Sequence, residues 1–226
     1  MAGKVVVDDR RVDKPSEKVR TEADIRLKGV KPFVSRGGEK LQAAIEHFGL
    51  QDLFKGAVVL DVGASTGGFT HCALKSGAKK SFALDVGTNQ LSWELRNHPQ
   101  VINLEKTDIR EFKAPVDSQI NIVVADISFN SLARLGESIL ESVDRENVHF
   151  IWLVKPQFEL DRYQIPKGGV VLDDDLRFEA LDRVRRIIED IWPVPLSIDF
   201  FTCPVSGRSG NREIFIYFRK SCKRSL

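Results

Sequence analysis

The chain has 226 residues, of which 42% are hydrophobic, so it is long enough for one α/β domain and a small appendage. Its 34 basic and 32 acidic residues leave a net charge of +2, which excludes a chain that is cationic throughout. Its three cysteines have no paired spacing and no apolar run approaches about 18 residues, which argues against a zinc site, a disulfide framework, a signal peptide or a spanning helix. We therefore expect a cytoplasmic protein with no membrane partner.

Charge is distributed unevenly along the chain. Residues 1–31 contain nine Lys/Arg and six Asp/Glu, and residues 208–226 contain six Lys/Arg and one Asp/Glu. The two ends are therefore basic and the middle is acidic on balance. Basic ends are typical of segments that bind a polyanion and equally of solubilising tails.

The first elements are short. KVVV at residues 4–7 and the residues after it predict two short strands around a polar turn, and Pro32 marks a boundary. A helical pattern begins at Gly38, because apolar residues recur at the spacing of one helix face: Leu41, Ala44, Ile45 and Phe48.

Strands and helices then alternate. Strand-like apolar runs occur at residues 57–62, 81–86, 101–105, 120–126 and 149–154. Helical patterns occur at 66–77, 89–97, 131–143 and 175–192, and two last strands, 195–203 and 213–220, are close enough to pair antiparallel. Helical crossovers require a parallel sheet, and the terminal hairpin adds two strands to it. The pattern predicts an α/β fold with the Rossmann-like seven-stranded sheet of class I methyltransferases.

The stretch DVGASTGGFT, residues 61–70, is a glycine-rich turn between a strand and a helix. A phosphate-binding loop needs a lysine after the glycines, and none follows here. A dinucleotide fold needs G-x-G-x-x-G, and Ser65 interrupts that pattern, although NAD stays the main competitor.

A third interpretation fits better. Asp61 and Asp85 end neighbouring strands, so both lie at the carboxyl edge of the sheet, where ligands bind. Asp85 can accept from both hydroxyls of a ribose, and the helix N-terminus offers free N–H groups to a carboxylate. Gly63, Gly67 and Gly68 allow a close approach of the backbone to a ligand. A ligand with a ribose and a carboxylate but no phosphate is S-adenosylmethionine, and Asp108 is placed to meet its adenine amino group.

Two further polar residues end strands of the predicted sheet. Asp126 ends the fourth strand and Lys155 ends the fifth, so both can face one cofactor. The alternative for Lys155 is an exposed lysine at a strand end. DISF in place of a Pro-Pro motif argues against base amino groups as methyl acceptors, and no cysteine lies near the fourth strand to attack a pyrimidine. A hydroxyl acceptor remains, with Lys155 as the base, which requires burial or a nearby cation to lower the lysine pKa.

Six motifs in order resemble one family: VSRGGEKL (34–41), DVGASTGGFT (61–70), DISF (126–129), KPQFE (155–159), KGGVV (167–171) and SGNREIFIYF (209–218). Together they resemble the TlyA group of hemolysins, which are FtsJ-like ribosomal RNA 2′-O-methyltransferases, over residues 33–220. The resemblance implies S-adenosylmethionine-dependent methylation of a ribose 2′-hydroxyl, with cytidine in ribosomal RNA as the target and ribosomal RNA or ribosomal subunits as partners.

The resemblance also implies site residues. The catalytic tetrad would be Lys40, Asp126, Lys155 and Glu213, with Lys155 as the base, Lys40 lowering its pKa, and the two carboxylates orienting the lysines. Read from the residues alone, Lys40 could be a solvated helix residue and Glu213 could pair with a neighbouring arginine. The cofactor site would comprise Asp61, Gly63, Ala64, Ser65, Thr66, Gly67, Gly68, Phe69, Asp85, Asp108 and Asp126. No metal is expected.

The family normally begins with a small RNA-binding domain of two helices and a β-hairpin. Residues 1–30 resemble only its hairpin half and residues 31–226 the FtsJ-like domain, so we expect a truncated chain or a start assigned at an internal methionine. The long loop 156–173 can close over RNA or be a mobile surface loop. Candidate phosphate contacts are Arg36, Arg162, Lys167, Arg208 and Arg212. The alternatives are a cytolysin, a non-catalytic RNA- or ribosome-binding protein and a small-molecule O-methyltransferase, and the sequence does not determine the oligomeric state.

Overall fold

The computed structural model of the protein describes residues 5–8, 10–12, 14, 16–27, 32–207 and 209–220. The chain divides into two compact units, residues 1–32 and 33–226. The division follows Pro32, the residue that the sequence marks as a break in regular structure.

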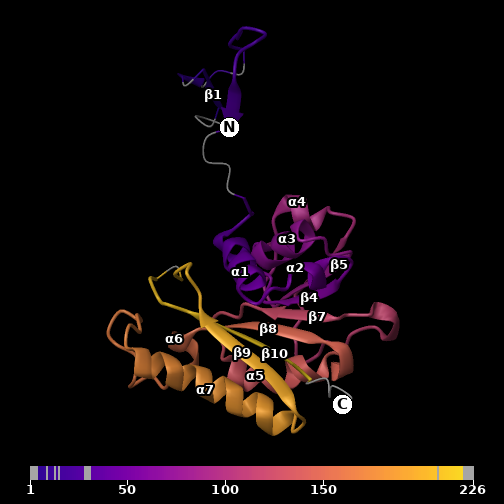
Figure 1. Ribbon diagram of the computed structural model, residues 1–226, viewed down its shortest axis with the longest axis vertical. Helices are drawn as coiled ribbons and strands as arrows, with labels where there is room; N and C mark the ends of the chain where they lie inside the picture. The colour runs from indigo at the N-terminus through magenta and orange to yellow at the C-terminus, as the bar shows by residue number, and fades with distance from the viewer. Residues whose placement is uncertain are drawn as a thin grey trace. The chain divides into compact units, whose positions relative to one another are not determined.

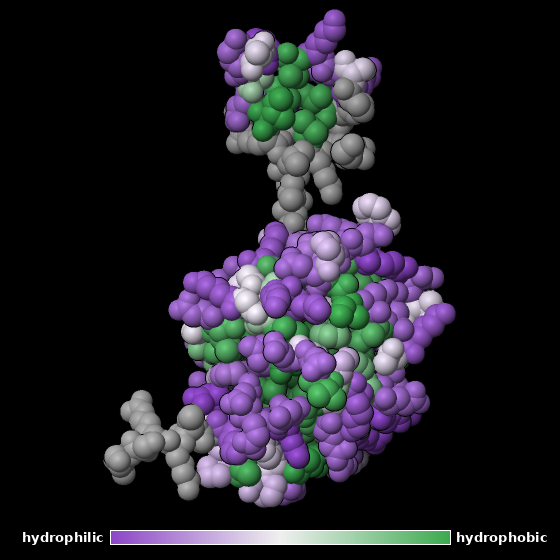
Figure 2. Space-filling model, turned by 90° about the vertical axis from the view of Figure 1, so that its right-hand side faces the viewer, coloured by the Kyte–Doolittle hydropathy of each residue, from purple (hydrophilic) through white to green (hydrophobic). Residues whose placement is uncertain are grey.

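The first unit is a small antiparallel sheet. Strand β1 (Val5–Val7) pairs with β2 (Arg10–Val12) on one side and with β3 (Ile25–Leu27) on the other. The predicted hairpin is thus present, but the expectation of two strands was wrong, because three residues are too few to reveal the alternation of β3. Val7 and Val12 are buried, and Figure 2 shows hydrophobic residues gathered on one face of this unit.

The second unit is built on a seven-stranded sheet in the order β6-β5-β4-β7-β8-β10-β9. The five strands from β6 to β8 run parallel, and β10 is antiparallel to both of its neighbours. The strands are β4 (Val58–Val62), β5 (Lys80–Asp85), β6 (Val101–Glu105), β7 (Ile122–Ala125), β8 (His149–Val154), β9 (Leu196–Thr202) and β10 (Ile214–Lys220). This confirms the predicted α/β class, the sheet and the terminal hairpin.

Helices cover both faces of the sheet (Figure 1). Helices α1 to α4 lie on one side in this view, and α5 and α7 lie on the other. Their bounds are α1 (Arg36–His47), α2 (Gln51–Phe54), α3 (Gly68–Lys75), α4 (Trp93–Arg96), α5 (Leu132–Glu141), α6 (Pro156–Glu159) and α7 (Asp174–Ile191), with short 3-10 turns at Val116–Ser118 and Arg145–Asn147. Ser131 and Asp173 cap α5 and α7 by accepting from the backbone N–H groups of Arg134 and Leu176.

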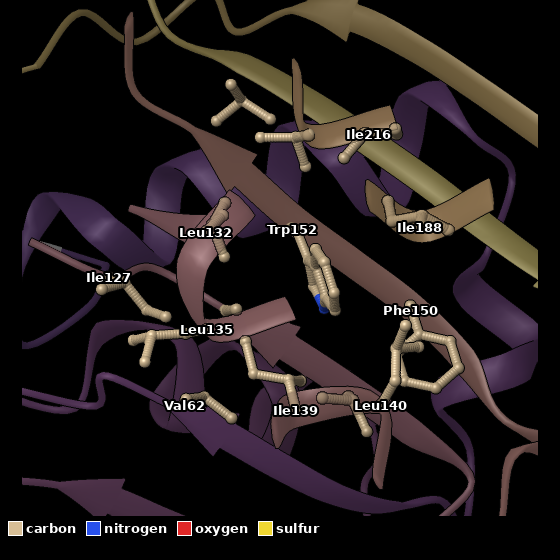
Figure 3. Packing of buried hydrophobic residues seen from close by; sticks show 14 of the residues in the cluster. Val62, Ile127, Leu132, Leu135, Ile139, Leu140, Phe150, Trp152, Ile188 and Ile216 are labelled. Carbon is tan, nitrogen blue, oxygen red and sulfur yellow. The ribbon is translucent and has the colours of Figure 1, made fainter. Parts of the chain in front are cut away.

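The core has two layers because successive strand residues point to opposite faces. In β4, Leu60 and Val62 pack with α5 and α7, whereas Val59 packs with α1 and α3. Figure 3 shows the first layer, where the fully buried Trp152 lies among aliphatic side chains of α5, α7 and the sheet. Cys72 and Cys203 are buried in the second layer, as expected of core thiols, and Cys222 lies outside the described residues.

Helix α4 is shorter than the sequence pattern predicts. Residues 89–97 predict a helix, but α4 spans only Trp93–Arg96. The backbone N–H groups of Gln90 and Leu91 donate instead to the side chain of Glu105, and Asn89 adopts a positive φ of 54°. These contacts hold a loop at the carboxyl end of β5. Among the described residues, no helix combines the length and apolarity needed to span a bilayer.

Candidate active site

A cavity of about 680 Å³ opens at the carboxyl edge of the parallel strands. Its wall includes the residues that follow β4, β5, β7 and β8, together with the first turns of α1 and the residue before β10. Sheet topology brings these segments together, because parallel strands end at one edge. All four predicted catalytic residues and ten of the eleven predicted cofactor residues line this cavity, Gly67 being the exception.

The turn after β4 lies against the end of β5. Both carboxylate oxygens of the buried Asp85 accept backbone N–H groups at 2.7 Å, one from Ser65 and the other from Gly87. Gly63 has a φ of 82°, and a Cβ there would lie 3.0 Å from the backbone oxygen of Asp126. Glycine at this position therefore permits the close approach of the turns after β4 and β7.

Asp61 is fully buried on the cavity wall. Its Oδ2 accepts from the Thr70 hydroxyl at 2.7 Å and from the Thr70 N–H at 2.9 Å. Its Oδ1 is buried and finds no hydrogen-bond partner among the described residues. Burial raises the pKa of Asp61 to about 7. The free oxygen is thus an acceptor that a donor group in the cavity can satisfy.

Gly67 and Gly68 lie where an added side chain would collide with neighbouring parts of the protein, and their approach to a ligand stays a prediction. A Cβ on Gly67 would lie 2.3 Å from Leu95 Cδ1. A Cβ on Gly68 would lie 2.3 Å from Ser35 Oγ and 2.9 Å from the backbone nitrogen of Gly38. These glycines therefore allow the start of α3 to pack closely against α1 and α4. The close contact between α1 and α3 brings the helix that carries Lys40 to the cavity.

Asp108 also lines the cavity, but its carboxylate is already engaged. Arg110 donates to Asp108 Oδ1 from its backbone N–H at 2.9 Å and from Nε at 3.0 Å. These hydrogen bonds hold the pKa of Asp108 below its ordinary value. Contact with an adenine amino group stays a prediction for this residue.

Lys155 and Asp126 meet where the adjacent strands β7 and β8 end. Lys155 Nζ lies 2.6 Å from Asp126 Oδ1 and donates to Ser128 Oγ at 2.7 Å. The lysine is buried, and its Nζ lies 5.9 Å from the centre of the Phe158 ring. An exposed lysine at a strand end is therefore excluded. A buried amine, held by an acid and a hydroxyl, faces the cavity.

Lys40 and Glu213 form a second buried pair. Lys40 lies on α1 and Glu213 directly precedes β10, and their Nζ and Oε2 atoms are 2.5 Å apart. Both residues are buried, at 7% and 2% exposure, which excludes a solvated Lys40 and a surface partner for Glu213. The cavity thus holds two lysines, each paired with its own carboxylate.

The residues predicted to contact phosphate are not gathered at the cavity as the predicted catalytic residues are. Arg36 lines the cavity at the first residue of α1 and is exposed. Arg162, Lys167 and Arg212 are exposed and lie outside the cavity wall. Arg208 falls outside the described residues. The described residues contain no cluster of three or more His, Cys, Asp or Glu side chains that could hold a metal ion.

Several residues of the site carried no clear signal in the sequence. Phe129 is 94% exposed, has a positive φ of 64° and lies at the cavity with its ring centre 5.7 Å from that of Phe158. Gln157 also lines the cavity, and its buried Oε1 has no partner among the described residues. Glu159 is buried and accepts from Ser131 and the first N–H groups of α5, so it fixes α6 against α5. Burial raises the pKa of Glu159.

The comparison with protein families decides the class of this chain. Residues 33–220 match the model of the FtsJ-like methyltransferases. The chain belongs to this family. Its members take their methyl group from S-adenosylmethionine.

Relatives of this FtsJ-like methyltransferase carry two kinds of name. The chain is 38% identical over 229 residues to the 16S/23S rRNA (cytidine-2'-O)-methyltransferase TlyA of Mycobacterium tuberculosis, covering 100% of this chain and 83% of that protein. It is 36% identical over 222 residues to Hemolysin A of Brachyspira hyodysenteriae, covering 96% and 90% of the two chains. A solved structure of a candidate hemolysin from Streptococcus thermophilus is 35% identical, with a TM-score of 0.75 over 97% of this chain and 79% of that one.

The cavity fits the methyl donor of the family. Buried acceptor oxygens on its wall, Asp61 Oδ1 and Gln157 Oε1, have no partner among the described residues, and Asp85 lies beside them at the end of β5. S-adenosylmethionine offers hydrogen-bond donors of the required kind, an ammonium group, ribose hydroxyls and an adenine amino group. Acceptors buried without partners are costly, so a ligand that satisfies them gains affinity.

Proposed function

We propose that this FtsJ-like methyltransferase transfers the methyl group of S-adenosylmethionine to the 2′-hydroxyl of a cytidine ribose in ribosomal RNA, with Lys155 as the general base. The observation that carries the proposal is the Lys155–Asp126 pair, with 2.6 Å between Nζ and Oδ1, inside the cavity that the glycine-rich turn also lines. The activity for which the Mycobacterium tuberculosis relative is named supports the choice of substrate.

The chemistry requires a base at this place. The cofactor supplies an electrophilic methyl group on a positively charged sulfur. The ribose hydroxyl is a weak acid, so its proton must leave as the oxygen forms the new bond to the methyl carbon and the bond between that carbon and sulfur breaks. The amine of Lys155 accepts that proton, and Asp126 and Ser128 hold the amine in position. General-base help of this kind contributes about 10²–10⁴ in rate.

The second lysine has a separate task. Glu213 holds Lys40 in the wall of the cavity that Lys155 also lines. A fixed charge is worth more in a cavity shielded from water than on an open surface. We assign Lys40 the orientation of the acceptor ribose and Glu213 the orientation of Lys40.

Binding of the large substrate is proposed to involve surfaces beyond the cavity. Arg36, Arg162, Lys167 and Arg212 are the described candidates for phosphate contacts, and Arg208 is a further candidate from the sequence. Residues 1–30 are proposed to act as part of a ribosomal-protein-type RNA-binding domain. A ribosomal subunit is the proposed partner, and this substrate implies a cytoplasmic location.

The test is transfer of labelled methyl from S-adenosylmethionine to ribosomal subunits that lack the modification. We expect label in a dinucleotide that resists alkaline hydrolysis, because a 2′-O-methyl group blocks cleavage at its own phosphate. Lys155→Ala is expected to lose the label while still binding the cofactor. Lys113→Ala is the matched control, because Lys113 is 63% exposed and pairs with Glu141 at the surface. Equal transfer by Lys155→Ala and the wild type would refute the assigned base.

The hemolysin name of the Brachyspira hyodysenteriae relative raises a second candidate function. Incubation of red cells with the purified wild-type protein and with Lys155→Ala tests it. Lysis by both proteins would support a cytolytic activity independent of methyl transfer. Methyl transfer without lysis would leave methylation of RNA as the function.

A further inference from the structure

Asn211 is a fully buried polar residue two positions before Glu213. Its side-chain Oδ1 accepts from the Val171 N–H at 2.7 Å, and its Nδ2 donates to the Gly169 oxygen at 2.9 Å. Both partners lie in the last third of the segment 160–173 that connects α6 to α7. One amide therefore ties this long segment to the turn between β9 and β10.

The backbone on the other side of Asn211 is also held. Arg177 of α7 is buried, at 3% exposure, and its Nε donates to the Arg212 oxygen at 3.3 Å. Its Nη2 donates to Thr202 Oγ1 at 2.9 Å, and Nη1 pairs with Asp174. The residue directly before Glu213 is thus fixed to α7 and β9.

Glu213 itself packs against the turn that Asn211 closes. The Gly207 N–H donates to the Asn211 backbone oxygen at 2.8 Å, and the Cys203 N–H donates to the Glu213 oxygen at 2.8 Å. A Cβ on Gly207 would lie 2.7 Å from Glu213 Oε1, so the carboxylate lies directly on the turn. Any shift of the turn therefore moves the carboxylate that holds Lys40.

We propose that Asn211 is a positioning residue for the Glu213–Lys40 pair and that it couples the segment 160–173 to this pair. The inference rests on the proposed function, because it gives Asn211 a role in methyl transfer. Asn211 touches neither the reacting atoms nor Lys40, and it acts by fixing the turn under Glu213. A misplacement of about 1 Å at a reacting centre can cost about 100-fold in rate.

The first test measures the pair without any substrate. Trace labelling with acetic anhydride, read by mass spectrometry, reports the reactivity of Lys40, whose Nζ is now engaged by Glu213. We expect Asn211→Ala to raise the labelling rate of Lys40 about tenfold relative to that of the exposed Lys113, because a displaced Glu213 releases the amine. An unchanged rate would overturn the proposal.

Gln164→Ala is the matched control. Gln164 is the other amide that anchors the same segment, since its Nε2 donates to Glu179 Oε2 at 2.8 Å and its Oε1 accepts from the Asp161 N–H at 3.1 Å. Its contacts lead to α7 and not to Glu213. Gln164→Ala is expected to leave Lys40 labelling at the wild-type rate. Equal increases in both variants would mean that general loosening of the segment, and not Asn211, exposes the pair.

The second test uses methyl transfer in a double-mutant cycle. Asn211→Ala is expected to lower kcat about 10- to 100-fold, with the KM for S-adenosylmethionine within about twofold of wild type. On a Glu213→Gln background the same substitution is expected to change kcat by less than about twofold, because the residue through which it acts has been altered. Equal losses on both backgrounds would assign Asn211 a general structural role.

Two further provisions distinguish a variant that fails to fold, or a protein without the proposed function, from a wrong role for Asn211. Asn211→Asp keeps the acceptor for Val171 and places an acceptor oxygen against the Gly169 oxygen in place of the donor. It serves if Asn211→Ala does not fold, and we expect it also to raise Lys40 labelling. If the wild-type protein transfers no methyl group to RNA, the proposed function fails, and the labelling of Lys40 still decides the role of Asn211.

Discussion

Lys40 and Glu213 stand 173 positions apart in the sequence, yet their side chains form a buried ion pair with Nζ and Oε2 2.5 Å apart. The pair joins α1, the first helix of the larger unit, to the residue directly before β10, the last strand of that unit. A buried charge is tolerated in a protein only when it is paired, so each residue requires the other.

Removal of one charge tests this relationship. Glu213→Gln keeps the size of the side chain and leaves the buried Lys40 ammonium without its counter-charge. We expect the free energy of unfolding, measured in urea, to fall by about 3 kcal/mol, since breaking a buried pair costs about 3–5 kcal/mol. Glu146→Gln is the control, because its pair with Lys220 is exposed, and it is expected to cost less than about 1 kcal/mol. Similar losses of unfolding free energy in the two variants would mean that burial does not increase the cost of breaking the Lys40–Glu213 pair.

Asp61 predicts a pH dependence of stability. Its pKa in the folded protein, about 7, exceeds the ordinary 3.8, so the folded state binds the proton more tightly than the unfolded state. The difference corresponds to on the order of 4 kcal/mol, which favours folding at low pH and is lost as pH rises through about 7. Asp61→Asn removes this titration. We therefore expect its stability relative to wild type to rise between about pH 4 and about pH 8 in urea unfolding.

A constant difference between Asp61→Asn and wild type across this pH range would contradict the raised pKa. The hydrogen bonds from Thr70 change the difference in unfolding free energy by an amount that does not depend on pH, because aspartate and asparagine both offer Thr70 an acceptor oxygen. Only the slope against pH therefore reports the titration of Asp61. The wild-type profile alone is insufficient, since other carboxyl groups contribute to it, including Glu159, whose pKa is also raised by burial.

The close contact of α1 with α3 is tested by two glycines. Gly68→Ala places a Cβ 2.9 Å from the Gly38 backbone nitrogen, which cannot yield without moving α1. We expect a loss of about 1–3 kcal/mol in unfolding free energy and a lower rate of methyl transfer, because α1 carries Lys40. Gly37→Ala is the control, since its Cβ would have no neighbour nearer than 3.4 Å and alanine favours a helix. Equal stabilities of the two variants would contradict the steric argument.

The sequence predicts which site residues lie close together where the geometry of the strands alone determines their positions. Asp126 and Lys155 end consecutive strands, and parallel neighbours bring such residues together, so their contact could be predicted from position. Lys40 and Glu213 could not be paired in this way. One lies on a helix before the sheet and the other precedes an antiparallel strand, and no periodicity relates them. Their inclusion depended on the resemblance to a family.

The glycines and acids of the turn show a second limit. A glycine after a strand indicates a tight or crowded backbone, but not whether the crowding comes from a ligand or from protein. Gly68 faces α1, and Asp108 is engaged by Arg110. Nothing in the sequence indicates that Asn211 is buried, because an asparagine in a polar turn is read in the same way whether its side chain is buried or exposed. Such roles depend on side-chain contacts that only the folded chain defines.

Phe129 gives the last prediction, because strain and exposure coincide there. A phenylalanine with a φ of 64° and 94% exposure costs stability, and its place on the wall of the cavity that Lys155 also lines fits stacking on a nucleobase. Phe129→Gly is expected to raise the unfolding free energy by about 1 kcal/mol and to lower kcat/KM for RNA about tenfold, with cofactor affinity unchanged. Phe200→Ala, on the edge strand β9, is the control and should leave kcat/KM unchanged. Unchanged RNA kinetics in Phe129→Gly would exclude the stacking role.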